Sequence, residues 1–408
     1  MLVPDELALR ARARAGCPAM ITERFAAQLL SGEPASSAVD VTRRLLAVQG
    51  QDPRGVRLAI RVRSIGLTAA DVDRALTTDR SILITWLNRG TLHLICAEDY
   101  WWLHALTTPP LLTASSRRLA QEGVLPADAD KAVAVIEAAL AADGPLTRGQ
   151  LRERIAAAGV RTEGQALVHL LFLASQRAGI VRGPIVGDEH AFVLTRDWLG
   201  APPAPLDRGA ALAELARRYL AGHGPADDRD LAKWAGLPLR DARRGLAAIA
   251  SELGDRDDGL ADLARRPRST PPALAPAAAP PRPAASSAAG PSAAPGPPDP
   301  DAALPPPRLF GAFDPLLLGW ASREPIVGAH QGIVAVNGLF RPFALIRGKA
   351  VAIWTLSGGK ITLTPLTRIA AADEAALMAD ADDVLRFLTE APPRPSRSAK
   401  GRRPKNTA

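Results

Sequence analysis

The sequence holds few of the residues that mark metal centres, disulfide frameworks or phosphate-binding loops. Among 408 residues there are only two cysteines, Cys17 and Cys96, and neither has a partner at metal-binding spacing. The sequence therefore predicts no structural zinc site and no disulfide framework, and it favours a reducing cytosol. A glycine-rich phosphate loop and a Gly-x-Ser-x-Gly motif are also missing. We expect neither a metal nor a cofactor.

Long apolar runs are missing too. No stretch is long enough to cross a bilayer, so we expect no membrane partner. The first residues do not form a signal peptide, because Asp5 and Glu6 are followed by Arg10, Arg12 and Arg14 with no apolar stretch behind them. These features predict a cytoplasmic protein, which we expect to be monomeric.

The net charge of +8 suggests a nucleic-acid partner, but its distribution weakens that argument. The segment from Ala391 onward holds six basic residues and no acidic one, and subtracting these six charges leaves +2. Any DNA-binding face must therefore come from a local cluster of arginines. The basic tail is most simply a disordered arm that binds phosphate weakly.

Two glutamines stand out near position 50. Val41, Leu45 and Val48 recur at helical spacing, Ser37 is a suitable N-cap, and Gly50 and Pro53 would end the helix. Gln49 and Gln51 would then lie at or just past the helix end, away from the apolar stripe. One interpretation is that their amides cap backbone groups at the turn. The other is that they hold a water molecule, since amides both donate and accept hydrogen bonds.

An internal repeat follows in the middle of the chain. Gly144-Pro145-Leu146-Thr147 and Gly224-Pro225-Ala226-Asp227 each follow an Ala/Leu-rich helix (131–142 and 209–221) and precede a short helix. A longer helix comes next in each copy, at 164–178 and 239–252. This is the helix-turn-helix order. After the first copy, two apolar segments flank Gly183-Pro184 and Gly187-Asp188 and predict a β wing. The second copy shows no such wing.

A second motif, Thr85-Trp86-Leu87-Asn88-Arg89-Gly90-Thr91-Leu92-His93-Leu94, follows the glutamines. Together, Gln49-Gly50-Gln51 and Arg89-Gly90-Thr91-Leu92-His93 resemble the winged-helix DNA-binding family that contains the AlkZ and YcaQ DNA glycosylases. The resemblance extends from about Ile21 to Thr367, apart from one insert. Gly50 departs from the family pattern, in which the middle residue is usually aliphatic.

The resemblance implies a monofunctional DNA glycosylase that acts on double-stranded DNA and removes bulky alkylated or crosslinked bases without metal or cofactor. An N7-alkylated purine is already cationic and leaves without a general acid, so the enzyme must mainly position a water and stabilise the sugar cation. Gln49 and Gln51 would be the catalytic pair. Asp52 lies one position past the acid of the Gln-x-Asp branch, which places this chain nearer the Gln-x-Gln branch.

Several further residues are candidate DNA contacts. Arg89 and Thr91 flank a glycine turn and are suited to gripping phosphate, whereas His93 is equally well interpreted as a packed strand histidine. An arginine-rich helical face after the glutamines would put positive charge beside them or would simply be solvated. The complete predicted DNA-binding set is Arg54, Arg57, Arg61, Arg89, Thr91, His93 and Arg341.

These observations predict an α+β protein with tandem winged-helix (helix-turn-helix) units followed by a C-terminal antiparallel β-rich region. A non-catalytic winged-helix DNA-binding protein or transcriptional regulator is the alternative function, and a protein-binding scaffold is a third possibility. The expected divisions are an N-terminal arm (1–20), a first winged-helix-like domain (21–127), a second winged helix (128–205), a third helix-turn-helix-like unit (206–268), a disordered Pro/Ala-rich linker (269–307), a β-hairpin or small-barrel region with a final helix (308–390) and a disordered basic tail (391–408).

Overall fold

The computed structural model of the protein describes residues 18–187, 189–265, 304–328, 331–335 and 338–389. Most of the predicted N-terminal arm and linker, and all of the basic tail, lie outside these ranges. None of the helices within them is both long and apolar enough to cross a membrane.

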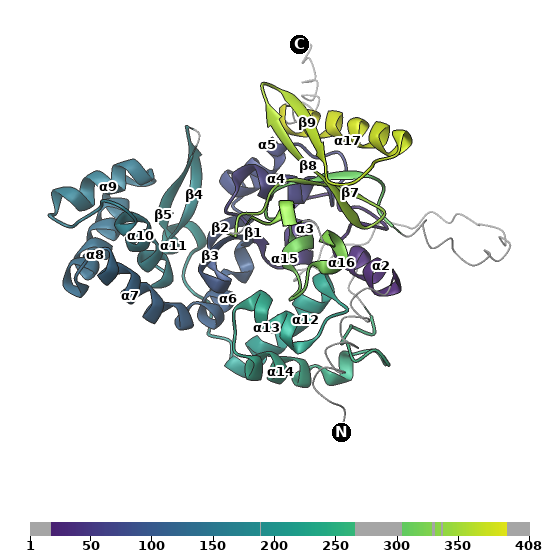
Figure 1. The fold of residues 1–408 in the computed structure, drawn as a ribbon. Coiled ribbons are helices and arrows are strands. Elements are labelled where there is room, and N and C mark those ends of the chain that lie inside the picture. The colour runs from purple at the N-terminus through teal and green to yellow at the C-terminus, as the bar shows by residue number, and fades with distance from the viewer. Residues whose placement is uncertain (1–17, 188, 266–303, 329–330, 336–337, 390–408) are drawn as a thin grey trace, which may run out of the picture.

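A five-stranded sheet lies at the centre of the molecule, and its neighbouring strands are all antiparallel (Figure 1). The two apolar segments that the sequence predicts to form a wing are both strands of this sheet, and so is the segment after Gly90. They share one sheet because Ile84 pairs with Arg182, so the sheet crosses the expected boundary at 127/128. In spatial order the strands are β1 (Val48–Gln49), β3 (Thr91–Cys96), β2 (Ile82–Leu87), β4 (Ile180–Val186) and β5 (Glu189–Leu194).

The helix that leads to the two glutamines is shorter than predicted. Ser37 caps it as expected, and its side chain accepts a hydrogen bond from the Asp40 amide. However, α3 (Ala38–Leu45) ends before Gly50, because Leu46 adopts a φ of 63° that no helix can continue. The prediction that the helix continues to Gly50 was therefore wrong, and Gln49 belongs to strand β1.

Four more helices surround the N-terminal side of the sheet. Thr68 and Asp71 form a capping box at the start of α5, with both reciprocal hydrogen bonds present. The helices are α2 (Pro18–Ala27), α4 (Pro53–Arg61), α5 (Ala69–Thr77) and α6 (Tyr100–Thr107), and α7 (Leu112–Gln121) leads into the first repeat.

Both copies of the repeat have the predicted order of three helices. The first copy consists of α8 (Pro126–Asp143), α9 (Arg148–Ala157) and α10 (Ala166–Gln176), and the second of α12 (Arg208–His223), α13 (Asp228–Ala235) and α14 (Leu239–Ala248). The second copy does have a minimal β pairing, which the sequence analysis missed. Ala226 pairs with Ala261 as Leu146 pairs with Phe192 in the first copy, and Leu253 pairs with Leu263.

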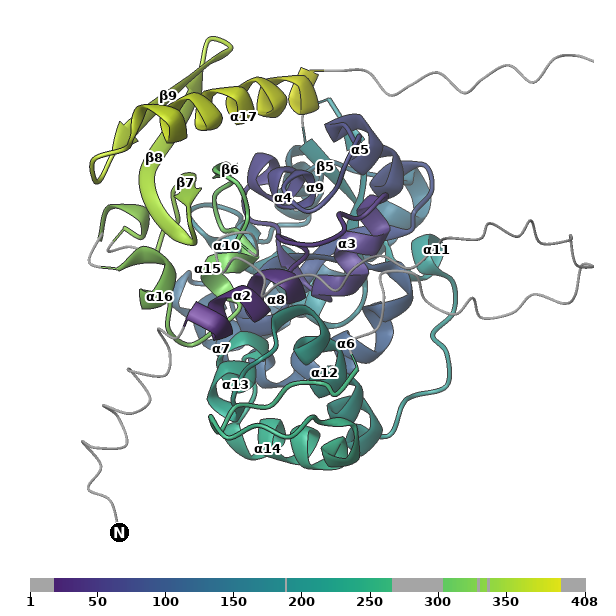
Figure 2. The same ribbon diagram turned by 90° about the vertical axis from the view of Figure 1, so that its right-hand side faces the viewer.

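The C-terminal part is an antiparallel meander beside a long helix. Its strands β6 (Arg308–Phe310), β7 (Phe343–Ile346), β8 (Lys349–Ser357) and β9 (Lys360–Pro365) form a four-stranded sheet in that order. The expected β-rich region with a final helix is present, and a short helix, α16 (Glu324–Val327), precedes β7. Helix α17 (Ala371–Thr389) lies along this sheet and contacts α4 and α5 (Figure 2).

The parts before and after residues 266–303 share their cores. One apolar cluster joins Val56 and Leu76 to Trp354 and Phe387. Arg63 and Asp314 form an ion pair at 2.7 Å across the same junction, and both side chains are fully buried. The C-terminal sheet therefore completes the fold around α4, the helix that follows the glutamines.

Candidate active site

The pairing of β1 with β3 brings the two sequence motifs together. Gln49 lies opposite His93, which in turn lies opposite Thr85 on β2. Gly50 donates its amide hydrogen bond to Leu92 O at 2.7 Å, so Gln49 and His93 form a non-hydrogen-bonded pair, in which the side chains approach most closely. The two motifs predicted from sequence to act together are thus neighbours on one face of the sheet.

The two glutamine amides are hydrogen-bonded to each other. Gln49 is buried, and its Nε2 donates to Oε1 of the exposed Gln51 at 2.5 Å. Gly50 between them does not disturb this arrangement. A Cβ added at Gly50 would lie 3.6 Å from Ile84 Cγ2, an ordinary contact, so the backbone here does not require glycine. The pair presents amide groups from the edge strand toward solvent.

Asp52 has a structural task at the start of α4. Its side chain accepts a hydrogen bond from the Gly55 amide and caps the helix, and Pro53 follows as the first helical residue. This capping role turns the carboxylate toward the helix N-terminus. The carboxylate of Asp52 is therefore engaged in the helix cap.

Arg89 connects the glutamines to the second repeat. It lies in the turn Asn88–Gly90 with a φ of 58°, and its Nη2 donates to Gln49 Oε1 at 3.3 Å. Its Nη1 donates to the carbonyl oxygens of Trp234 and Lys233, at the end of α13. Burial lowers the pKa of Arg89 from its ordinary value. No sequence pattern indicated this long-range contact, because its acceptors are backbone carbonyls.

His93 is neutral and held in one tautomer. Its Nδ1 lies 2.9 Å from Thr91 O, and because a carbonyl oxygen only accepts, Nδ1 carries the proton and Nε2 is the acceptor. Burial, followed by the nearby charge of Arg89, lowers the pKa of His93 to about 3. Thr91 donates its hydroxyl to Asn88 O at 3.2 Å. Both residues thus stabilise the turn that carries Arg89.

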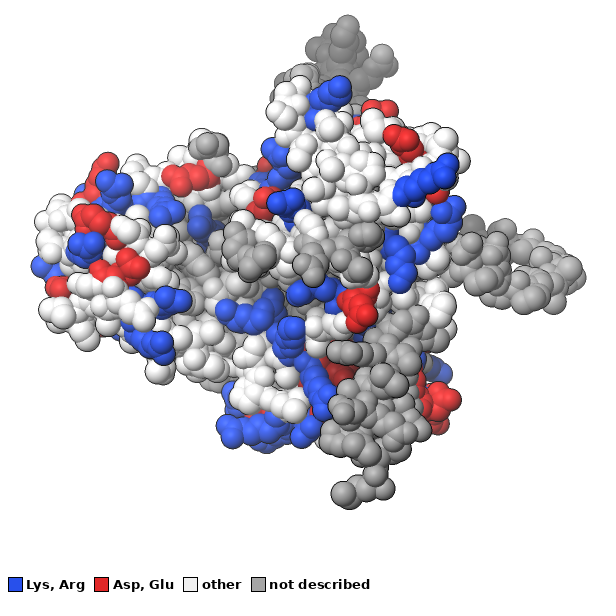
Figure 3. Space-filling model, viewed as in Figure 1, with Lys and Arg blue, Asp and Glu red and all other residues white. Residues whose placement is uncertain are grey.

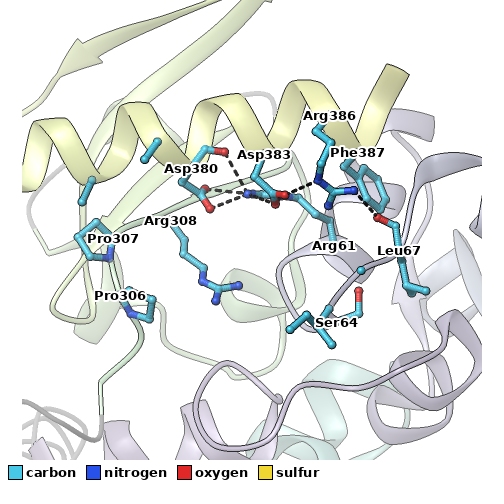
Figure 4. Close-up of a pocket in the computed structure, with 14 residues that line it drawn as sticks. Arg61, Ser64, Leu67, Pro306, Pro307, Arg308, Asp380, Asp383, Arg386 and Phe387 are labelled. Carbon is cyan, nitrogen blue, oxygen red and sulfur yellow. Dashed lines mark hydrogen bonds and ion pairs between the residues drawn. The ribbon is translucent and has the colours of Figure 1, made fainter. Parts of the chain in front are cut away.

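The predicted arginine-rich face of α4 is divided among different tasks, and for Arg61 the prediction was wrong. Arg61 is buried and binds Asp380 and Asp383 of α17, at 2.5 and 2.7 Å (Figure 4). Arg57 donates to Asp73 Oδ1 at 2.7 Å and to Pro53 O at 2.6 Å. Helix α4 therefore uses both arginines mainly to hold neighbouring helices in place.

Arg54 and Arg341 are exposed. Arg54 lines a recess of about 400 Å³, and Asp52, Pro342 and Trp354 are among the other residues that line it. Arg341 directly precedes Pro342 in the sequence. In Figure 3 the blue side chains gather over the middle of the face, where few red ones are seen. The C-terminal meander thus brings Arg341 near the start of α4.

One cluster of potential metal ligands occurs among the described residues, and we assign no metal to it. Cys96, Glu98 and Asp99 have ligand atoms within 4.8 Å of one another. Burial raises the pKa of Cys96 to about 12, so the thiol stays protonated, and Asp99 is ion-paired with Arg218 at 2.9 Å. A thiol ligand must lose its proton to bind a metal.

Comparisons with known proteins agree on one family. The family model for "DNA glycosylase AlkZ-like" proteins matches residues 42–387. The interstrand DNA cross-link repair glycosylase of Streptomyces sahachiroi is 26% identical over 364 residues, which cover 84% of this chain and 88% of that protein. The solved structure of the S. sahachiroi DNA glycosylase AlkZ has a similar fold, with a TM-score of 0.65 at 22% identity, over 91% of this chain and 96% of that chain.

Proposed function

Because the chain belongs to the AlkZ-like DNA glycosylase family, and is thus an enzyme that hydrolyses N-glycosyl bonds, we propose that it excises bulky N7-alkylated purines from duplex DNA. Crosslinked purines are included in the proposed substrates, since the S. sahachiroi relative is named for interstrand cross-link repair. The family match confirms the resemblance seen in the sequence. It also sets aside the alternative of a non-catalytic regulator.

The reaction asks little of the protein beyond positioning. A water oxygen bonds to C1′ of the sugar, the C1′–N9 bond breaks, and its electron pair neutralises the cationic purine, which leaves without a proton. The water proton passes to solvent. Amides are too weak to act as general bases, but they can hold the water below C1′ and face the developing sugar cation with carbonyl oxygens. We assign this role to Gln49 and Gln51.

The observation that carries the proposal is the hydrogen-bonded pair of amides. Gln49 is buried and fixed by the sheet, whereas Gln51 reaches the surface, so the pair extends from a rigid support to the solvent. The neighbouring His93 is neutral and offers a further acceptor atom. No lysine amine is among these residues, which supports hydrolysis by water over a Schiff-base intermediate.

We further propose that the repeats act as winged-helix units that flank the duplex. Arg54 and Arg341 are the best candidates for phosphate contacts, since both are exposed. Arg54 lines the recess, and Arg341 directly precedes Pro342, another lining residue. Arg57 and Thr91 are secondary candidates because each already has a partner within the protein. Binding to phosphates would weaken with salt, and each lost phosphate contact would lower the slope of log K against log salt by about 0.9.

The test is a single-turnover excision assay on a duplex that carries one N7-alkylguanine. We expect the wild type to release the base and Gln51→Ala to lower the rate by roughly 100-fold or more, because the water is no longer held. DNA affinity should stay within about twofold, since Gln51 makes no phosphate contact in this proposal.

The matched control is Gln165→Ala, which removes an exposed glutamine far away in the sequence, at the start of α10. It should excise at the wild-type rate. Equal loss of excision and binding in Gln51→Ala would contradict the water-positioning role. A wild type that binds the duplex but releases no base for any alkyl size would overturn the proposed substrate class.

A further inference from the structure

We propose that Arg89 is a positioning residue, which sets the orientation of the Gln49 amide and thereby decides which atoms the glutamine pair offers to the reacting water. This inference rests on the proposed function of the pair and goes beyond it. From the sequence, Arg89 is a candidate phosphate contact. The hydrogen bonds of its guanidinium indicate a different task.

Arg89 determines the orientation of the two glutamine amides. A guanidinium has only donors, so the Gln49 atom that faces Arg89 Nη2 at 3.3 Å must be Oε1. The Nε2 of Gln49 is then turned toward Gln51, whose Oε1 accepts at 2.5 Å. Arg89 therefore fixes the orientation of the Gln49 amide, and with it the direction of the hydrogen bond from Gln49 to Gln51. A flipped Gln49 would place its NH₂ against the cation and its oxygen against the oxygen of Gln51.

Arg89 is itself held by the end of helix α13. Its Nη1 binds the carbonyls of Lys233 and Trp234, where the last residues of α13 leave backbone acceptors free and the helix dipole is negative. Among the described residues, no carboxylate lies within ion-pair distance of Arg89. A charged partner would compete with the Gln49 amide for the guanidinium, whereas neutral carbonyls fix it and leave Nη2 for Gln49.

The backbone at Arg89 is in contact with the backbone just past helix α13. Arg89 has a φ of 58°, and Gly236, just past α13, has a φ of 70°. A Cβ on Gly236 would lie 2.8 Å from the Arg89 amide nitrogen, so the two turns touch backbone to backbone. The turn after β2 and the end of α13 are thus in direct contact. The second repeat acts here as a support for the glutamine pair.

The decisive experiment is a double-mutant cycle on single-turnover excision with Arg89→Ala, Gln49→Ala and the double variant. We expect Arg89→Ala to slow excision by roughly 10- to 100-fold, because the amide pair loses its fixed direction. The same change in the Gln49→Ala background should cost less than about threefold, because Arg89 acts through Gln49. Arg89→Lys, which keeps a donor at this position, should recover part of the rate.

Two further measurements separate this role from others. The salt dependence of duplex binding should be unchanged in Arg89→Ala, whereas a phosphate contact would lower the slope by about 0.9. Arg308→Ala is the matched control for stability: Arg308 is also partly buried and donates to a backbone carbonyl, Val62 O at 3.0 Å, away from the glutamines. It should excise at the wild-type rate. If Arg89→Ala does not fold, the same cycle is run with Arg89→Lys.

Additive losses in the cycle, or a reduced salt slope, would overturn the positioning role of Arg89. These results leave the proposed function intact as long as the wild type excises the base. A wild type that does not excise would instead contradict the proposed function itself, so the two failures are distinguishable.

Discussion

Helices α9 and α13 begin in the same way and end in different surroundings. Each follows a Gly-Pro turn, and each starts with a capping box: Thr147 with Gln150 in the first repeat, and Asp227 with Asp230 in the second. In the first repeat both of these hydrogen bonds lie at the surface. In the second repeat Asp230 is buried and has partners from two other parts of the chain.

Those partners join the second repeat to helix α2 and to the C-terminal part of the chain. Asp230 pairs with Arg24 of α2 at 3.3 Å and accepts the amide hydrogen bond of Ala321 at 2.8 Å. The first repeat is connected to the rest of the molecule through the central sheet. There the ring centre of Trp86 lies 5.8 Å from that of Phe172 and 6.2 Å from that of Phe192. Similar local sequences therefore specify similar helices, while the neighbouring parts of the chain decide whether a polar cap is exposed or buried.

The largest effect is expected from removing the side chains that complete the two capping boxes, Asp230 and Gln150. Asp230→Ala would leave Arg24 buried without its carboxylate, so we expect the free energy of unfolding to fall by about 3–5 kcal/mol. Burial raises the pKa of Asp230 and lowers that of Arg24, so the intact pair itself contributes little, and the cost comes from the unpaired charge. Gln150→Ala at the equivalent exposed position removes one hydrogen bond and should cost about 1 kcal/mol or less. Urea denaturation measures both, and similar losses would contradict the comparison.

The next effect concerns the glycines that follow the two short helices. Gly236 has a φ of 70° and Gly159 a φ of 77°, so alanine is strained at both. Only at Gly236 would the new Cβ meet Arg89; at Gly159 nothing lies within 4 Å. We expect Gly236→Ala to slow excision roughly tenfold, whereas Gly159→Ala leaves the excision rate unchanged. Equal rates for the two variants would show that α13 does not support the glutamine pair.

The smallest effect is on the pH dependence of stability. Burial lowers the pKa of His223 in the second repeat to about 3, from 6.5. Between these values the unfolded chain binds a proton that the folded chain does not, so stability falls as pH decreases from about 6.5. His223→Phe should reduce this dependence by about 1.4 kcal/mol per pH unit.

The half-exposed His169 of the first repeat is the control, because burial also lowers its pKa but the side chain is still partly accessible. His169→Phe should change the slope less than His223→Phe does. Melting temperatures measured from pH 7 to pH 5 distinguish the two variants. An equal change in slope would show that burial of His223 does not control the pH response.

Local patterns in the sequence predicted those helices and helix caps that depend on residues close together in the chain. The Ser37 cap and the helices of both repeats follow from short-range hydrogen bonds and apolar spacing, and all are present. The short strand that holds Gln49 was missed because its two residues are extended only through pairing with β3, more than 40 positions later in the chain. No local pattern distinguishes such a strand from the end of a helix.

The arginines of α4 also show that local patterns do not reveal long-range partners. Periodicity placed Arg57 and Arg61 on one face of a helix, as the structure has it, but it could not show what covers that face. The carboxylates that bind Arg61 lie on α17, some 320 positions away. The family resemblance identified Gln49 and Gln51 as candidates, but the link from Arg89 to α13 became visible only in three dimensions.

The buried ion pair between Arg63 and Asp314 has a consequence for exchanging parts between family members. From the sequence, the predicted region 308–390 looks like a separate module that a recombinant enzyme could borrow. Transplanted without α4 and Arg63, this region would carry an unpaired carboxylate and expose the apolar side of its sheet, and the part left behind would keep an unpaired guanidinium. Chimeras must therefore exchange both sides of this junction together.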